Sequence, residues 1–130
     1  MRAVKIDIHT HTRKCKSGDA QTREISPEGF CDAILSTEVG VVAITNHNIF
    51  DLSQFQAIQA RIGTNARVWP GVELDVYDDH GKGHLLVITS PKLATQFSAA
   101  VTALTKGHTP DSFKVTIPDV LATFDAMEPL

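Results

Sequence analysis

Short apolar runs alternate with polar clusters along the first part of the chain. Residues 4–8 (VKIDI) are mostly apolar and β-branched, and the polar residues 9–12 follow them. This is the pattern of a buried strand that ends in a loop. Residues 41–44 (VVAI) lead in the same way into the polar residues 45–48. Both runs are too short for a helix, so we expect two strands with polar ends.

Four helices are predicted between and after the strands. Ser26 can cap a helix with Pro27 at its first position, and Asp51 with Gln54 resembles a capping box. Apolar residues then recur at helical spacing on one face of each helix. These residues are Phe30, Cys31, Ile34 and Leu35; Phe55, Ile58 and Ile62; Leu93, Phe97, Val101 and Leu104; and Val120, Leu121, Phe124 and Met127.

The middle of the chain has the composition of a hairpin. Residues 68–69 and 72–77 are rich in strand formers, residues 78–83 are rich in turn formers, and residues 84–89 form another strand-like run. Strands that alternate with helices indicate βα units and a largely parallel sheet. The predicted fold class is therefore α/β, with about four strands and four helices. Functional residues should gather at the C-terminal ends of the strands.

Length, charge and cysteine content exclude several classes of protein. A chain of 130 residues is one domain's worth and too short for a complete eight-fold β/α barrel. A net charge of -3 does not favour nucleic-acid binding, and the two cysteines lack metal or redox spacing. No run reaches the roughly 18 apolar residues of a membrane span, and no signal peptide precedes the domain, so we expect a cytoplasmic protein without membrane contact.

Histidines and one glutamate supply the candidate chemistry. His9 and His11 lie two residues apart at a strand end and can present two imidazoles to one ion. About 0.3 such pairs are expected by chance, so the pair alone is a weak signal. His47 ends the second predicted strand, and Glu73 and His84 lie in the hairpin. Imidazoles with a shared carboxylate are typical of metal-dependent hydrolases, although each residue alone could be an ordinary polar side chain.

Four segments resemble, in order and spacing, the first motifs of the PHP (polymerase and histidinol phosphatase) family. They are residues 7–12 (DIHTHT), 44–48 (ITNHN), 70–73 (PGVE) and 83–86 (GHLL). The resemblance covers about residues 4–90. It implies a distorted, TIM-like β/α barrel of seven strands and a site for two or three divalent ions, which are zinc, manganese or iron. The chain would then be a single PHP-like domain over residues 1–130, truncated on its C-terminal side.

The resemblance also implies a set of metal ligands. A glutamate would bridge two ions, and histidines would complete the coordination of each. The implied ligands are His9, His11 and Glu73 for a first ion, Glu73 and His84 for a second, and His47 for a third.

Two positions depart from the family pattern or match it weakly. Many relatives have a ligand shortly after the His-x-His pair, for which Asp19 is the candidate here, with an ordinary turn residue as the alternative. The second motif usually reads Thr-Asp-His, whereas Asn46 stands here, which removes a charge that could orient His47. The family's later ligands would lie beyond residue 130, so about half of the site is expected.

Three cations follow the His-x-His pair directly. Arg13, Lys14 and Lys16 place positive charge next to the predicted metal site, and we expect them to attract and orient a phosphate. The alternative is a solvated loop with ordinary surface cations.

The leading hypothesis from the sequence is a metal-dependent phosphoesterase, a hydrolase that is active when its domain is complete. A hydroxide between two metals would attack phosphorus in a small phosphorylated substrate or a nucleic acid phosphodiester, without a protein nucleophile. Alternatives are a noncatalytic, regulatory metal-binding module attached to a polymerase or an ATPase, and a nuclease whose basic loop holds a nucleic acid backbone. An incomplete barrel would be completed by further chain, a second subunit or another protein.

Overall fold

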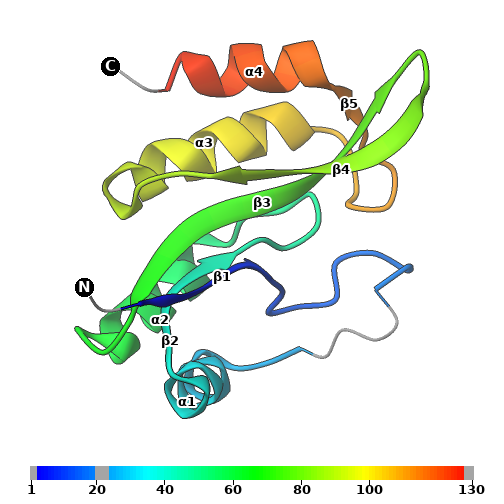
Figure 1. Cartoon of the computed structure of the whole chain (residues 1–130). Coiled ribbons are helices and arrows are strands. Elements are labelled where there is room, and N and C mark those ends of the chain that lie inside the picture. The colour runs from blue at the N-terminus through cyan, green and yellow to red at the C-terminus, as the bar shows by residue number, and fades with distance from the viewer. Residues whose placement is uncertain (1–2, 20–23, 128–130) are drawn as a thin grey trace.

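The computed structural model describes residues 3–19 and 24–127 as one β-sheet with helices packed on one of its faces (Figure 1). The strands are β1 (Lys5–Thr10), β2 (Val39–Ile44), β3 (Arg67–Asp78), β4 (Gly81–Ile88) and β5 (Val115–Thr116). The helices are α1 (Pro27–Thr37), α2 (Leu52–Ile62), α3 (Ala94–Thr105) and α4 (Ile117–Asp125), with a 3-10 turn at Pro91–Leu93. Among the described residues, no helix is both long and apolar enough to span a bilayer.

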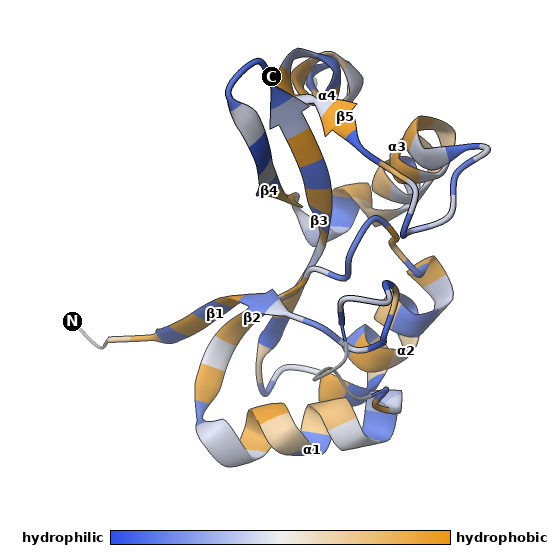
Figure 2. Cartoon of the chain, turned by 90° about the vertical axis from the view of Figure 1, so that its right-hand side faces the viewer, coloured by the Kyte–Doolittle hydropathy of each residue, from blue (hydrophilic) through white to orange (hydrophobic). Residues whose placement is uncertain are grey.

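Strand β3 connects the two ends of the sheet. Strands β1, β2 and β3 are parallel, and the first part of β3, up to Pro70, pairs with β2. From Gly71 onward β3 pairs antiparallel with β4, and Val76 and Tyr77 pair with the short parallel strand β5. Figure 2 shows that the sheet curls along β3, with β1 and β2 at one end and β4 and β5 at the other. The predicted α/β class and the hairpin are confirmed.

Helices α1 and α2 begin at the predicted caps. The Ser26 hydroxyl accepts a hydrogen bond of 3.0 Å from the N–H of Gly29, and Asp51 accepts one of 3.0 Å from the N–H of Gln54. Each cap satisfies an N–H of the first helical turn, which has no partner within the helix. Helix α1 ends where Glu38 takes a left-handed conformation, with φ of 61°. Local sequence therefore determines where these helices begin.

The apolar core lies between the helices and the face of the sheet they cover. Phe97 of α3 is fully buried, and its ring lies 5.0 Å from that of Phe50 and 5.5 Å from that of Phe124. Two predicted core residues are exposed instead, Leu35 at 48% and Leu121 at 54%. Each follows a buried residue by one position, which turns it about 100° around the helix and away from the sheet.

Strand β1 is exposed, contrary to the prediction of a buried strand. Ile6 is 63% exposed, and Val4 and Ile8 are at least half exposed. Among the described strands it stands at the edge of the sheet and pairs with β2 alone. The apolar composition of the strand predicts burial, but composition does not reveal which strand lies at an edge of the sheet.

Strand β3 runs without interruption through Pro70 and Gly71, two residue types that are unfavourable inside a strand. Proline is tolerated because its missing N–H falls where the partner of β3 changes from β2 to β4. A Cβ on Gly71 would lie 2.9 Å from Cγ2 of Thr45, 3.0 Å from the carbonyl oxygen of Val87 and 3.1 Å from that of Ile44. Glycine therefore allows the three strands to approach one another at this point. Strand β4 also begins earlier than predicted, at Gly81.

Adding a methyl group at Gly71 should destabilise the protein. We expect Gly71→Ala to lower the free energy of unfolding by about 1–3 kcal/mol, because backbone atoms of two strands would have to move. Gly83→Ala is the matched control, since a Cβ at Gly83 has no neighbour within 4 Å, and its change should stay within about 1 kcal/mol. Urea denaturation measures both, and equal effects would contradict this account of the strand junction.

Candidate metal centre

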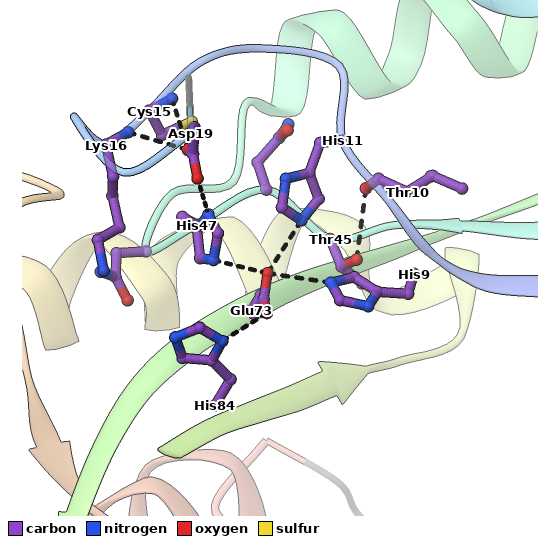
Figure 3. Close-up of polar contacts among 12 residues, drawn as sticks. His9, Thr10, His11, Cys15, Lys16, Asp19, Thr45, His47, Glu73 and His84 are labelled. Carbon is purple, nitrogen blue, oxygen red and sulfur yellow. Dashed lines mark hydrogen bonds and ion pairs between the residues drawn. The ribbon is translucent and has the colours of Figure 1, made fainter. Parts of the chain in front are cut away.

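Strands β1 and β2 near their ends, and β3 and β4 in their interiors, bring the predicted ligands together (Figure 3). His9 lies in β1 and His11 just after it, while Glu73 lies in β3 and His84 in β4. Pairing between β2 and β3 continues past the end of β2, where His47 forms a bridge with Glu73. Backbone hydrogen bonds of 3.0 Å and 2.9 Å on either side of this bridge fix His47 beside Glu73.

Four imidazoles surround the carboxylate of Glu73, which is 2% exposed. Three of them crowd one oxygen. Glu73 Oε2 lies 3.1 Å from Nε2 of His9, 2.9 Å from Nε2 of His11 and 2.8 Å from Nε2 of His47. The other oxygen, Oε1, lies 3.0 Å from Nδ1 of His84. The residues predicted as ligands from separate segments therefore converge on one carboxylate.

Hydrogen bonding does not account for all of these contacts. Neither ring nitrogen of His47 has a hydrogen-bond partner among the described residues, although each lies within 2.8 Å of a carboxylate oxygen. Buried polar atoms without partners are rare in folded proteins. Donor atoms bound at 2.0–2.2 Å to one tetrahedral zinc ion lie roughly 3.3–3.6 Å from one another, so small outward shifts of these side chains would admit an ion. The crowding and the unpartnered nitrogens of His47 therefore fit side chains that share cations.

Asp19 lies on the other side of His47. Its Oδ1 is 2.6 Å from Nδ1 of His47, and its Oδ2 accepts hydrogen bonds of 3.1 Å and 3.0 Å from the N–H groups of Cys15 and Lys16. Burial alone would raise the pKa of Asp19, but the N–H groups of Lys16 and Cys15 outweigh it and lower the pKa. Asp19 is thus an ionised turn residue that also reaches the cluster.

Asn46 does not orient His47, which is the role expected of an acid at this position. Its side-chain oxygen accepts the N–H groups of Thr12 at 2.8 Å and Arg13 at 3.3 Å, and its amide donates to the Thr12 hydroxyl at 2.9 Å. An aspartate could accept the first two hydrogen bonds but could not donate the third. Asn46 therefore holds the loop that carries His11 and leaves the position next to His47 Nδ1 to Asp19.

Sequence reasoning missed Asp75 and Asn48. Asp75 is two positions after Glu73 and directly opposite His84 in the hairpin, and its buried Oδ1 lies 3.1 Å from His84 Nε2. That oxygen has no hydrogen-bond partner among the described residues. Asn48, with φ of 55°, accepts the N–H of Asp75 at 3.0 Å and donates to its Oδ2 at 3.2 Å. The spacing of two from Glu73 was the signal for Asp75.

Overlapping groups of side chains could each hold an ion. In every group the three donor atoms lie within 4.8 Å of one another. The groups are His9, His11 and Glu73; His11, Asp19 and His47; and His47, Asp75 and His84.

The charge states of the cluster suit cation binding. Burial lowers the pKa of His11, and the neighbouring His47 lowers it further, so the ring is neutral at neutral pH. Burial alone would raise the pKa of Glu73, but the hydrogen bond to His9 and the nearby imidazoles lower it overall. A neutral imidazole at His11 and an ionised carboxylate at Glu73 are the forms in which these two side chains bind divalent metals.

The three predicted phosphate-binding cations lie in different settings. Nη2 of Arg13 is 3.2 Å from Oδ2 of Asp51, the cap of α2. The ammonium group of Lys16 forms an ion pair with Asp75, so Lys16 borders the cluster. Lys14 is exposed. The structure thus places Lys16 next to the cluster, while Arg13 contacts the N-cap residue of α2.

Comparison with solved structures finds a distant likeness. No family model matches the sequence, and no curated protein matches it. A crystal structure from Bifidobacterium adolescentis ATCC 15703, of a protein inferred to be a metal-dependent phosphoesterase, matches with a TM-score of 0.49 and 19% identity. The match covers 80% of this chain and 35% of that one. This chain therefore spans about a third of the length of that protein.

Removing the charge of Glu73 should weaken metal binding. We expect Glu73→Gln to lower the affinity for zinc or manganese by at least about a hundredfold, more than a supporting residue would, because the amide keeps the shape and loses the charge. The control is His108→Ala, because His108 is exposed and outside the cluster. Isothermal titration calorimetry checks this, and unchanged affinity in Glu73→Gln would contradict the assignment.

Proposed function

We propose that this chain carries the metal site of a metal-dependent phosphoesterase. The observation that supports this most is the convergence of four imidazoles on the buried carboxylate of Glu73. Imidazole and carboxylate ligands together are typical of zinc, manganese and iron hydrolase sites. The PHP-like order of the motifs supports the same activity. The curled sheet is compatible with the first part of a seven-stranded β/α barrel.

The donor set suggests how the ligands divide. His9, His11 and Glu73 would hold one cation, and His84 would join Glu73 at a second. His47 and Asp19 would bind a third cation. The distance of 2.6 Å between His47 Nδ1 and Asp19 Oδ1 supports this assignment. When bound, divalent ions would lower the pKa of an attacking water and offset charge on the phosphoryl oxygens.

The side chains next to the cluster have two expected roles. The cations would position the substrate, and the thiol of Cys15 would not act as a nucleophile. Burial raises the pKa of Cys15 to about 11, so this thiol next to the cluster stays protonated at neutral pH and is a poor nucleophile. Lys16, tied to Asp75, would orient a phosphate at the edge of the cluster. Lys14 and Arg13 would add to the local positive potential that attracts the substrate. A small phosphorylated molecule is the substrate class we favour.

Hydrolysis of a phosphate ester should depend on metal and on His11. We expect p-nitrophenyl phosphate to be hydrolysed with added manganese or zinc, to resist hydrolysis after EDTA treatment, and to regain turnover on metal addition. His11→Ala should lower kcat/KM by at least about a hundredfold, since a ligand is lost. His80→Ala is the control, because this exposed histidine lies in the hairpin turn. Turnover that survives EDTA, or that His11→Ala leaves intact, would refute the proposal.

A further inference from the structure

One face of the β3–β4 hairpin continues from the metal cluster to a second charged region. Glu73, Asp75 and Tyr77 alternate along β3 and point to the same face. In the antiparallel register His84 is opposite Asp75, and Lys82 is opposite Tyr77. Lys82 is therefore on the face of the metal ligands, two residues or about 7 Å along the strand from His84.

A cavity lies along this row of side chains. Its volume is about 600 Å³, and its lining includes His84 of the cluster together with Lys16, Lys82 and Lys114. The last two lysines come from different segments, β4 and the loop before β5. The ammonium group of Lys114 lies 5.5 Å from the centre of the Tyr77 ring, which holds it over this face. Two exposed cations thus border one cavity beside the metal cluster.

The acids of the cavity are already engaged by other groups. Asp75 forms its ion pair with Lys16. Asp111 accepts hydrogen bonds of 2.9 Å from both the N–H and the hydroxyl of Ser17. The contacts of these two acids in the described part of the chain therefore leave Lys82 and Lys114 available to an anion from solution. Three lysines against two aspartates give the cavity a net positive charge.

We propose that the cavity binds a second phosphate group, so that the substrate is a short bisphosphorylated molecule. This inference rests on the proposed function, since the first phosphate would be at the metal cluster. Water oxygen would bond to that phosphorus as its ester P–O bond breaks, and the leaving alcohol would take up a proton from the water. The second phosphate would stay on the leaving alcohol, held by Lys82 and Lys114. Two ammonium groups match the charge of a phosphate dianion.

The test compares two esters that differ only in the second phosphate. Propane-1,3-diyl bisphosphate and propyl phosphate are assayed with manganese on the wild type, on Lys82→Ala/Lys114→Ala and on the control Lys92→Ala, an exposed lysine outside the cavity. We expect the wild type to prefer the bisphosphate by at least about tenfold in kcat/KM. The double variant should lose this preference while its kcat/KM for propyl phosphate stays within about twofold. A preference that is absent in the wild type, or that persists in the double variant, would overturn the proposal.

A binding measurement separates this proposal from the proposed function. Propane-1,3-diyl bisphosphonate, which cannot be hydrolysed, is titrated calorimetrically into the wild type and the double variant. Tighter binding by the wild type, about tenfold, supports the second phosphate site even if neither ester is hydrolysed. Tighter binding without hydrolysis of either ester would refute the phosphoesterase and keep the second phosphate site. If both esters are hydrolysed but the wild type and the double variant bind the bisphosphonate equally, the second phosphate site is refuted and the phosphoesterase is kept.

Discussion

The arrangement of this protein depends on the burial of one carboxylate among four imidazoles. Glu73 is almost completely removed from solvent, and an ionised carboxylate in that position is unfavourable unless other groups compensate its charge. Imidazoles from three other segments provide the compensation, at 2.8 Å to 3.1 Å. Divalent cations at these ligands, as we propose, would complete the electrostatic balance.

The surrounding structure keeps these side chains in place. Gly71 lets β2, β3 and β4 approach closely two residues before Glu73, and the bridge at His47 extends the pairing of β2 and β3 to the site. Asn46 and Asn48 then fix the loop with His11 and the strand position of Asp75. Such supporting hydrogen bonds set the direction of metal ligands and influence their affinity. The site is therefore built as much by backbone amides and asparagines as by the ligands.

Local signals in the sequence predicted more than long-range ones could. The caps at Ser26 and Asp51 and the hairpin follow from neighbouring residues. The set of histidines with Glu73 was instead predicted from their places in separate strands and from the PHP-like motifs. The exposure of β1 and the two-residue strand β5 depend on partners far along the chain. Asn48 was missed for the same reason, since its role arises from a hydrogen bond to Asp75, 27 positions further along the chain. Asp75 itself has a local signal, its spacing of two residues from Glu73. The ion pair between Arg13 and Asp51 likewise could not be predicted from local sequence, because it joins residues from two separate segments.

The central claim is that these side chains share bound cations. Anomalous diffraction from crystals grown with manganese or zinc tests it most directly. The account predicts an anomalous peak within about 2.0–2.3 Å of Glu73 and of the ring nitrogens of His9 and His11. The absence of any peak among these residues at saturating metal, with the imidazoles hydrogen-bonded only to Glu73, would contradict it.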